Sequence, residues 1–385
     1  MAMLGRNRRL AILAEGCFTP LDAKTAVGVL RYRPGEVAAV LDSTRAGKTA
    51  DACVGVGGAI PVVGDLGAAA RLGADSLLIG VAPQGGELPA AWRATVRESL
   101  ERGWDVLSGL HAFLGDDAEL AALAAARGAR LLDLRRPPAR RLIAAGRAAE
   151  LEATVVLTVG SDCNVGKMTA ALELARALGD RGIRAAFAAT GQTGVCIADH
   201  GVVVDAVAAD FVAGETEDLV LAAAGSSAPG AGTGPAAEVV VVEGQGSLLH
   251  PAYSGVTLGL LHGACPAALV LCHQAGRDRL RVAGGNSAGW PIPALRDLIA
   301  IYEAAAGWLR KAPVVGVALN TLGLDEGAAR AACERAARET GRPATDPVRF
   351  GAGVLAEAVL AARATLRSAG TAEPAAARRS HASRP

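Results

Sequence analysis

The sequence predicts an α/β protein with two parallel sheets, and three observations lead to this fold class. Short apolar segments alternate with helix-like segments along most of the chain, which is the order found in parallel sheets. Two arginines and two prolines at 135–138 interrupt the alternation. A β-branched run at 154–159 then leads through a glycine-bounded loop into a helix. We therefore expect a Rossmann-like N-terminal domain at residues 1–138, a P-loop NTPase-like parallel α/β domain at residues 139–367, and a disordered tail at residues 368–385.

In the N-terminal domain, the expected strands are short apolar runs: Leu10–Ala14, Val37–Leu41, Ser76–Val81, Asp105–Gly109 and Arg130–Leu134. The expected helices between them are Leu66–Leu72, Ala90–Arg102 and Asp117–Arg127. Two glycine-containing stretches, at 46–49 and 55–58, lack the full glycine fingerprint of a dinucleotide site. They fit tight turns at strand ends, or loops that face a ligand, because ligands bind at the carboxyl ends of parallel strands.

A short helical segment at Ala139–Glu150 is expected to lead into the second domain. Its expected strands are Thr154–Val159, Ala185–Ala189, Glu238–Val242, Ala268–Cys272 and Val314–Leu319, again with helices between them. The stretch Ala224–Ala237 is rich in glycine, proline and alanine, so we expect a flexible surface excursion there.

Composition excludes several functional classes. Of the 385 residues, 51% are hydrophobic and 20% charged, which predicts packed cores, and the formal net charge of +1 argues against a polyanion-binding surface. Only 3% are aromatic, so a stacking platform for nucleic acid is not expected. The seven cysteines form no C-x-x-C pair and indicate reduced thiols. We expect a cytoplasmic homo-oligomer that acts on small molecules, with no nucleic-acid or membrane partner.

The most informative stretch is the loop between Gly160 and Lys167. Strand, glycine-bounded loop, lysine and helix together form a phosphate cradle, in which backbone N–H groups and the helix terminus face the anion. Only four of the 39 basic residues are lysines, so a lysine kept here suggests a need for a slim ammonium group. A surface turn before an ordinary helix is the alternative. We assign phosphate binding to Ser161, Asp162, Cys163, Asn164, Val165, Gly166, Lys167, Met168 and Thr169.

This loop departs from the common G-x4-G-K-[ST] pattern. Five residues separate Gly160 from Gly166, and Met168 replaces the Ser or Thr whose hydroxyl helps to hold Mg²⁺. Thr169 lies about 100° farther around the helix, and a thioether is a poor ligand for a hard cation. The pattern therefore favours phosphate binding over metal-assisted phosphoryl transfer. Within the loop, Cys163 fits a small residue that allows curvature better than a nucleophile.

A second polar loop, Thr190-Gly191-Gln192-Thr193-Gly194, follows the expected strand at 185–189. Its glycines allow close backbone approach, and its hydroxyls and amide can bind phosphate or carboxylate. A plain turn would need fewer polar groups. We therefore assign Gln192, Thr193 and Gly194 to cofactor binding.

A third polar loop begins at Glu243, directly after the expected strand at 238–242. P-loop folds place a metal-binding or water-orienting acid at this position, although a structural cap would explain the glutamate equally simply. Three neighbours that offer an amide, a backbone approach and a hydroxyl are assigned to substrate binding: Gln245, Gly246 and Ser247.

Other candidates for proton transfer lie farther along the chain. His250, Tyr253 and His273 can each donate and accept protons, and with Glu243 they form our catalytic set, although a single histidine is more often structural. Arg277 has a guanidinium fork that suits a substrate carboxylate, or it is a solvated loop charge. No metal ligands are assigned.

Four motifs together resemble one family: Gly-Ser-Asp-Cys-Asn-Val-Gly-Lys-Met-Thr, Ala-Thr-Gly-Gln-Thr-Gly, Ala-Asp-Phe-Val-Ala-Gly and Val-Glu-Gly-Gln-Gly-Ser-Leu-Leu-His-Pro. The family comprises P-loop proteins formerly of unknown function that are now associated with D-glutamate N-acetyltransferases. The resemblance covers about residues 9–363. It implies acetyl-CoA as the donor and an acidic amino acid as the acceptor. On this basis we expect N-acetyl-D-glutamate formation in amino-acid catabolism.

The second domain is also remotely similar to dethiobiotin synthetase, which shares the five-residue loop before Gly-Lys. That resemblance implies a phosphate-binding role for Lys167 and a metal-binding role for Glu243, but Met168 stands where that family has threonine. The alternative function is therefore an ATP-dependent ligase or kinase acting on a carboxylate, and Mg²⁺ is expected only in that case. A nucleotide-binding switch is the alternative outside the enzymes.

Overall fold

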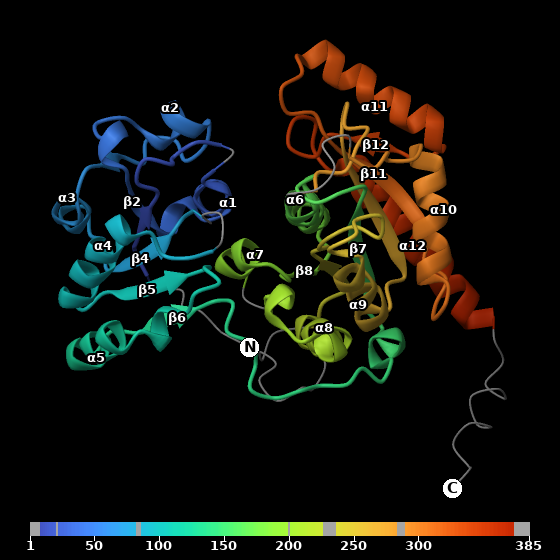
Figure 1. Cartoon of the computed structure of the whole chain (residues 1–385). Helices are drawn as coiled ribbons and strands as arrows, with labels where there is room; N and C mark the ends of the chain where they lie inside the picture. Colours follow the sequence, from blue (N-terminus) through green and yellow to red (C-terminus); the bar gives the residue numbers. More distant parts are fainter. Residues whose placement is uncertain are drawn as a thin grey trace, which may run out of the picture. The chain divides into compact units, whose positions relative to one another are not determined.

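The computed structural model describes residues 8–20, 22–81, 86–198, 201–225, 236–282 and 289–372, without the side chains of 369–372. Its contacts divide the chain into two compact units (Figure 1). The first unit holds Met1–Arg140 and Ala189–Ala208, and the second holds Arg141–Ala188 and Ala209–Pro385. Residues 189–208, which we expected in the second domain, therefore belong to the first unit.

The first unit contains, within the described residues, a six-stranded parallel sheet of order β3-β2-β1-β4-β5-β6. Its strands are β1 (Leu10–Leu13), β2 (Val37–Leu41), β3 (Val62–Val63), β4 (Ser76–Ile79), β5 (Asp105–Ser108) and β6 (Leu131–Asp133). Its helices are α1 (Lys24–Tyr32), α2 (Ala50–Val54), α3 (Leu66–Arg71), α4 (Ala90–Glu101), α5 (Ala118–Arg127) and α7 (Gln192–Ile197). This strand order confirms the Rossmann-like prediction, while β3 is a strand that the sequence pattern did not indicate.

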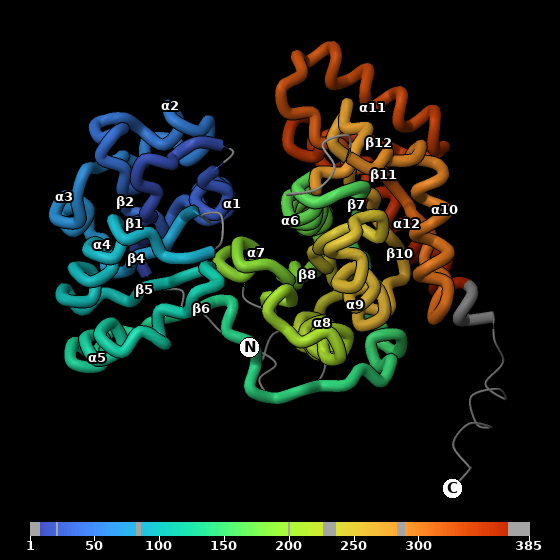
Figure 2. The backbone as a smooth tube through the Cα atoms, in the orientation of Figure 1, coloured from blue at the N-terminus to red at the C-terminus, as the bar shows by residue number. Residues whose placement is uncertain are grey.

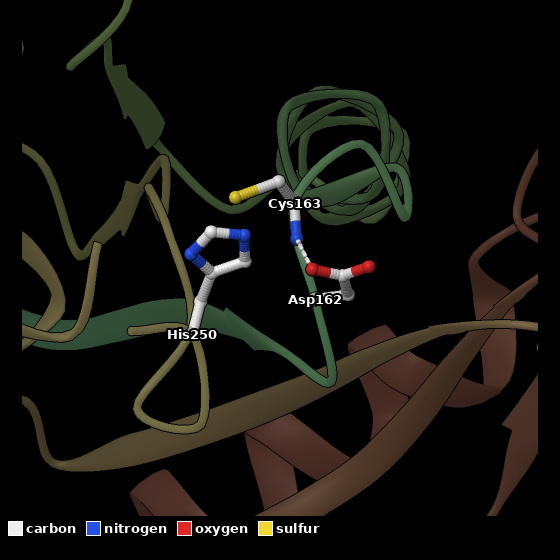
Figure 3. A group of neighbouring side chains, drawn as sticks. All are labelled: Asp162, Cys163 and His250. Carbon is white, nitrogen blue, oxygen red and sulfur yellow. Dashed lines mark hydrogen bonds between the residues drawn. The ribbon is translucent and has the colours of Figure 1, made fainter. Parts of the chain in front are cut away.

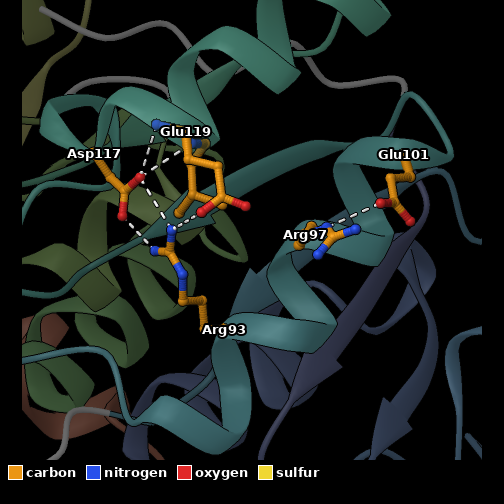
Figure 4. A network of polar contacts seen from close by, with 6 residues as sticks. Arg93, Arg97, Glu101, Asp117 and Glu119 are labelled. Atoms are coloured by element: carbon orange, nitrogen blue, oxygen red, sulfur yellow. Dashed lines mark hydrogen bonds and ion pairs between the residues drawn. The ribbon is translucent and has the colours of Figure 1, made fainter.

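An arginine joins helices α4 and α5 of this unit (Figure 4). Arg93 on α4 pairs with Asp117, the N-cap of α5, and with Glu119 in the first turn of α5. Asp117 also accepts the backbone N–H of Leu120 at 3.1 Å. The hydrogen bond from Arg93, followed by the one from Leu120, lowers the pKa of Asp117 to about 2. The cap therefore stays charged at neutral pH and defines where α5 begins.

The second unit contains, in its described part, a six-stranded parallel sheet of order β12-β11-β10-β7-β9-β8. Its strands are β7 (Thr154–Gly160), β8 (Ala185–Ala188), β9 (Val239–Val242), β10 (Ala268–Gln274), β11 (Val314–Asn320) and β12 (Ala344–Thr345). Its helices are α6 (Lys167–Gly179), α8 (Ala209–Ala223), α9 (Ser254–Ala264), α10 (Leu295–Ala306), α11 (Glu326–Thr340) and α12 (Gly353–Ala372). The expected parallel P-loop-like sheet is confirmed.

The core of the second unit lies on both faces of its sheet (Figure 2). Helices α6 and α12 contact each other and cover one face, where Leu174 and Leu355 pack against Val156 and Val270. Helices α8, α9 and α10 pack from the other side against β9, β7 and β11. Strand β7 is thus buried along its whole length, which holds the loop that follows it in place.

Two expectations at the borders of the second unit were wrong. The segment at 139–150 is not an α-helix, and only a 3₁₀ turn forms at Arg147–Glu150. The backbone N–H groups of Ala145 and Arg147 donate to the buried carboxylate of Glu217, instead of to helical carbonyls. At the other end, α12 continues to Ala372, through the first residues of the expected tail.

The surface excursion and the tail, both expected to be flexible, fall mostly outside the described residues. The residues outside are 226–235 of the surface excursion and 373–385 of the tail. Among the helices that the structure describes, none is long and apolar enough to cross a membrane.

Candidate active site around the P-loop

The phosphate cradle predicted at 161–169 forms one loop and the first turn of α6. Strand β7 ends at Gly160, and the loop turns through two residues with positive φ, Asn164 at 56° and Gly166 at 103°. Helix α6 then begins at Lys167. Met168 and Thr169 follow in its first turn, both half-buried. Because β9 and β10 lie on either side of β7, the carboxyl ends of these strands place Glu243 and His273 beside the loop.

A buried ion pair holds the shape of the loop. The carboxylate of Asp162 is fully buried and lies 3.1 Å from a guanidinium nitrogen of Arg277. The same carboxylate accepts the backbone N–H groups of Cys163 at 2.7 Å and Arg281 at 2.9 Å. Arg277 also donates to the carbonyl of Cys163 at 2.8 Å. The loop is therefore tied to the segment after β10, which lies more than 100 residues away in sequence.

The guanidinium fork of Arg277, predicted to bind a substrate carboxylate, is already engaged by groups of the protein. Its two terminal nitrogens contact Asp162, Cys163 and the side chain of Gln274. The guanidinium thus supports the P-loop in this structure. Its predicted contact with a substrate carboxylate stays a prediction.

Lys167 lies under the loop, as a phosphate-binding lysine must. Its side chain is buried and its Nζ donates to the carbonyl of Asp162 at 2.7 Å. Burial lowers the pKa of this ammonium, and the nearby carboxylate of Glu243 acts in the opposite direction. A phosphate in the cradle would likewise favour the charged form of Lys167.

The loop that carries Glu243 is fixed tightly against β7. Glu243 is buried, and its Oε1 accepts the side-chain amide of Gln245 at 3.1 Å. The backbone N–H of Gly244 donates to Thr158 Oγ1 at 2.9 Å. A Cβ at position 244 would lie 1.7 Å from the carbonyl oxygen of Thr158, so only glycine fits. This contact sets the distance between the acid-bearing loop and the cradle.

His250 is buried, and both of its ring nitrogens contact backbone groups. Nδ1 accepts the N–H of Ala252 at 3.2 Å, so Nε2 carries the proton and donates to the carbonyl of Arg281 at 3.1 Å. The ring of Tyr253, which is 49% exposed, stacks on the imidazole at 4.6 Å. Both ring nitrogens of His250 are thus bonded here, and its role as a base stays a prediction.

Asp162, Cys163 and His250 form a compact group in which the thiol points toward the imidazole (Figure 3). Their possible ligand atoms lie within 4.8 Å of one another. These atom types suit a soft metal, but the carboxylate and both ring nitrogens are already bonded, and Arg277 places a positive charge beside them. Burial raises the pKa of the Cys163 thiol. We therefore assign Cys163 to the packing of the loop.

His273 lies inside β10, because this strand continues past the predicted end at Cys272. The register that pairs Cys272 with Gly160 brings His273 level with Ser161, and the imidazole Nδ1 is 2.9 Å from the Ser161 hydroxyl. Burial, and then the positive charge of Arg277, lowers the pKa of His273 to about 4. The ring is therefore neutral at pH 7.

This lowered pKa predicts a pH-dependent stability. Between pH 6.5 and about 4 the unfolded chain protonates this imidazole and the native chain does not, so the free energy of unfolding decreases as the pH falls through this window. His273→Gln keeps a hydrogen-bonding side chain, and we expect it to flatten this decrease. Urea unfolding at a series of pH values measures the effect, with the exposed His111→Gln as control. Equal pH profiles for His273→Gln and the unaltered chain would contradict the expectation.

Gln192, Thr193 and Gly194 belong to the first unit, where α7 packs against α1. The hydroxyl of Thr193 lies 2.8 Å from that of Thr25, and Arg33 donates to the carbonyl of Ile197 at 2.8 Å. These contacts explain why the segment after β8 groups with the first unit. The predicted cofactor contacts of these three residues stay a prediction.

Sequence reasoning missed Tyr302 on α10. Its side chain is fully buried, and its hydroxyl donates to the carbonyl of Gly160 at 2.7 Å and accepts the N–H of Leu248 at 3.1 Å. An aromatic residue on the apolar face of a helix is normally a core residue, so the sequence has no signal that indicates these contacts.

Comparison with known families supports this arrangement. A family described as a domain of unknown function, the DUF1611_C P-loop domain, matches residues 142–356. Its companion, the DUF1611_N Rossmann-like domain, matches residues 43–137. The chain belongs to the DUF1611 family. A crystal structure of a DUF1611 family protein from Anabaena variabilis shares 40% sequence identity and a TM-score of 0.84, covering 92% of this chain and all of that one.

Two curated relatives of this DUF1611 protein are named D-glutamate N-acetyltransferase. The one from Tritonibacter scottomollicae is 37% identical over 89% of this chain and 95% of the relative. The one from a Pseudoalteromonas species is 38% identical over 74% of this chain and 80% of the relative. Relatives of this similarity place the chain among the acetyltransferase enzymes.

Proposed function

We propose that the protein transfers the acetyl group of acetyl-CoA to the amino group of D-glutamate, giving N-acetyl-D-glutamate and free CoA, as a step in amino-acid catabolism. The observation that carries the proposal is the loop after β7, with a buried lysine beneath it and Met168 in place of the usual metal-binding hydroxyl. Coenzyme A carries phosphates that such a cradle can hold, and acyl transfer leaves no γ-phosphate to cleave. The names of the two relatives supply the acceptor.

The reaction assigns separate tasks to the residues of the site. Loop N–H groups and Lys167 hold the phosphates of acetyl-CoA. A base takes one proton from the substrate ammonium, and the amine nitrogen bonds to the acetyl carbon. The nitrogen then loses a second proton, and the carbon–sulfur bond breaks as the CoA sulfur takes up a proton. Glu243 lies beside the loop and is a better base than His250, whose nitrogens are both bonded, or His273, whose pKa is lowered to about 4. Backbone N–H groups can stabilise the oxyanion.

The alternative function, an ATP-dependent ligase or kinase, is supported by one feature, the buried Glu243 at the end of β9 beside Lys167. Two features weigh against it. Asp162 is already paired with Arg277, and the thioether of Met168 cannot ligate Mg²⁺ well. The residues at the cradle thus offer few oxygen ligands to a hard cation.

One assay separates the two functions. The purified protein is incubated with D-glutamate and acetyl-CoA, and separately with D-glutamate, ATP and Mg²⁺, while free thiol, ADP and phosphate are followed. We expect thiol release with acetyl-CoA, and mass spectrometry should identify N-acetyl-glutamate. L-glutamate and D-aspartate test the acceptor. Release of ADP without thiol release would support the alternative function.

Acetyl transfer is expected to be independent of divalent metal. Thioester aminolysis develops no charge between phosphates that an ion must neutralise, so EDTA should leave the rate nearly unchanged. Met168→Thr restores the hydroxyl and is expected to strengthen Mg-ATP binding, with little effect on acetyl transfer. Rates measured with EDTA, and with Mg²⁺ added back, test this. Loss of turnover in EDTA that Mg²⁺ reverses would show that the metal-free mechanism is wrong.

A further inference from the structure

Tyr302 connects two loops of the candidate site from a helix that belongs to neither. The residue lies on α10, and its side chain is the largest among the fully buried side chains of the described residues. Its hydroxyl donates to the carbonyl of Gly160, where the P-loop begins, and accepts the N–H of Leu248 in the loop that carries Glu243.

These contacts use the hydroxyl both as a donor and as an acceptor. A phenol has one proton to donate and two lone pairs to accept with. The proton is donated to the carbonyl of Gly160, and a lone pair accepts the N–H of Leu248. Burial raises the pKa of the phenol, so the proton stays in place. A movement of the Gly160 peptide therefore changes the position of the Tyr302 hydroxyl oxygen, which also bonds the loop at 243–250.

Other contacts also hold the loop at 243–250 together, so that it moves as one body. Gly244 is fixed against Thr158, and Thr257 on α9 donates to the carbonyl of Gln245 at 2.8 Å. The segment between Glu243 and His250 is thus held at its start by β7, in its middle by α9 and near its end by Tyr302. The Tyr302 contact connects the loop at 243–250 to Gly160 at the start of the P-loop, while Thr158 Oγ1 donates to the carbonyl of Lys167 at 3.2 Å, at the other end of the P-loop.

We propose that Tyr302 is a positioning residue that couples occupation of the P-loop to the geometry of the loop at 243–250. Phosphate groups drawn toward Lys167 tighten the P-loop from Gly160 onward. The phenol transmits this change to Leu248, and so to the loop that presents Glu243. The coupling rests on the proposed function only where it concerns catalysis, because binding of a phosphate ligand is enough to reveal it. Because the coupling is reciprocal, ordering of the loop at 243–250 also strengthens phosphate binding.

The test combines amide hydrogen exchange with kinetics on the full chain. In the unaltered protein, CoA should slow exchange at 160–166 and also at 247–250. Tyr302→Phe keeps the ring and removes the oxygen, and it should retain the first protection and lose the second. We expect its kcat for acetyl transfer to fall about tenfold, equivalent to about 1.4 kcal/mol, with a smaller change in KM for acetyl-CoA. Tyr32→Phe, which removes a tyrosine hydroxyl of the first unit, is the matched control.

Several outcomes would overturn the proposal. Protection at 247–250 that survives in Tyr302→Phe, or a lower melting temperature with unchanged kcat, would show that Tyr302 only packs. If Tyr302→Phe does not fold, the exchange data on the unaltered protein still test the coupling, because absence of CoA protection at 247–250 refutes it. Should CoA give no protection at 160–166, ADP is the second phosphate probe, and absence of protection at 247–250 with both probes refutes the coupling. Protection at both loops without acetylation of D-glutamate supports the coupling and contradicts the proposed function.

Discussion

Lys167→Ala is expected to weaken binding of acetyl-CoA about 10- to 150-fold, which corresponds to the roughly 1.5–3 kcal/mol of a hydrogen bond to a charged group. The fold should be retained, because within the described residues the ammonium donates one hydrogen bond, to the carbonyl of Asp162. Isothermal titration with CoA measures the affinity, and thermal unfolding checks the fold. Lys311→Ala removes an exposed lysine of the same unit and is the control.

Arginine is not expected to replace Lys167. The lysine stem passes between two glycines, and a Cβ at Gly160 would lie 3.0 Å from Lys167 Nζ, while a Cβ at Gly244 would lie 3.1 Å from its Cδ. A planar guanidinium is wider than an ammonium and cannot enter such a channel without displacing the loop. Lys167→Arg should therefore bind CoA as weakly as Lys167→Ala. Unchanged affinity of Lys167→Ala for both acetyl-CoA and ATP would show that the loop is not a phosphate cradle.

Asp162→Ala is expected to lower the free energy of unfolding by about 3–5 kcal/mol, because it leaves the buried guanidinium of Arg277 without its carboxylate. The N–H groups of Cys163 and Arg281 also lose their acceptor. CoA binding should be lost as well, since the same contacts shape the loop. Urea unfolding and calorimetric titration measure the two effects. Asp180→Ala, an exposed aspartate just after α6, is the control.

A double variant separates the ion pair from the rest of the site. Removing both partners in Asp162→Ala/Arg277→Leu eliminates the unpaired charge, so its stability should exceed that of Asp162→Ala alone. Asp162→Asn keeps an oxygen acceptor without the charge, and an intermediate stability is expected. Equal stability of Asp162→Ala and the unaltered chain would mean that the buried pair does not hold the loop.

Local patterns were enough to predict the elements that carry the site. The β-branched run at 154–159, the glycines and the helix formers after Lys167 all act over a few residues, and the structure has β7, the loop and α6 where they indicate. The strand alternation likewise predicted two parallel sheets, because apolar period and length are local properties. The observed strand ends differ from the predicted ones where a neighbouring strand extends the pairing. Strand β10, for example, continues through His273 and pairs there with β11.

The partners of the site residues could not be predicted in the same way. Asp162 meets Arg277, and Gly160 meets Tyr302, across more than 100 residues of sequence, and both contacts depend on the strand order β10-β7-β9 and on which helix covers which face. The grouping of 189–208 with the first unit depends on side-chain contacts such as Thr25 with Thr193. The sequence alone thus determined the strand, the loop and the helix that begins at Lys167, since these follow from local backbone preference. Only the tertiary structure decided what holds the cradle, because long-range pairs are selected by packing and burial of the whole unit.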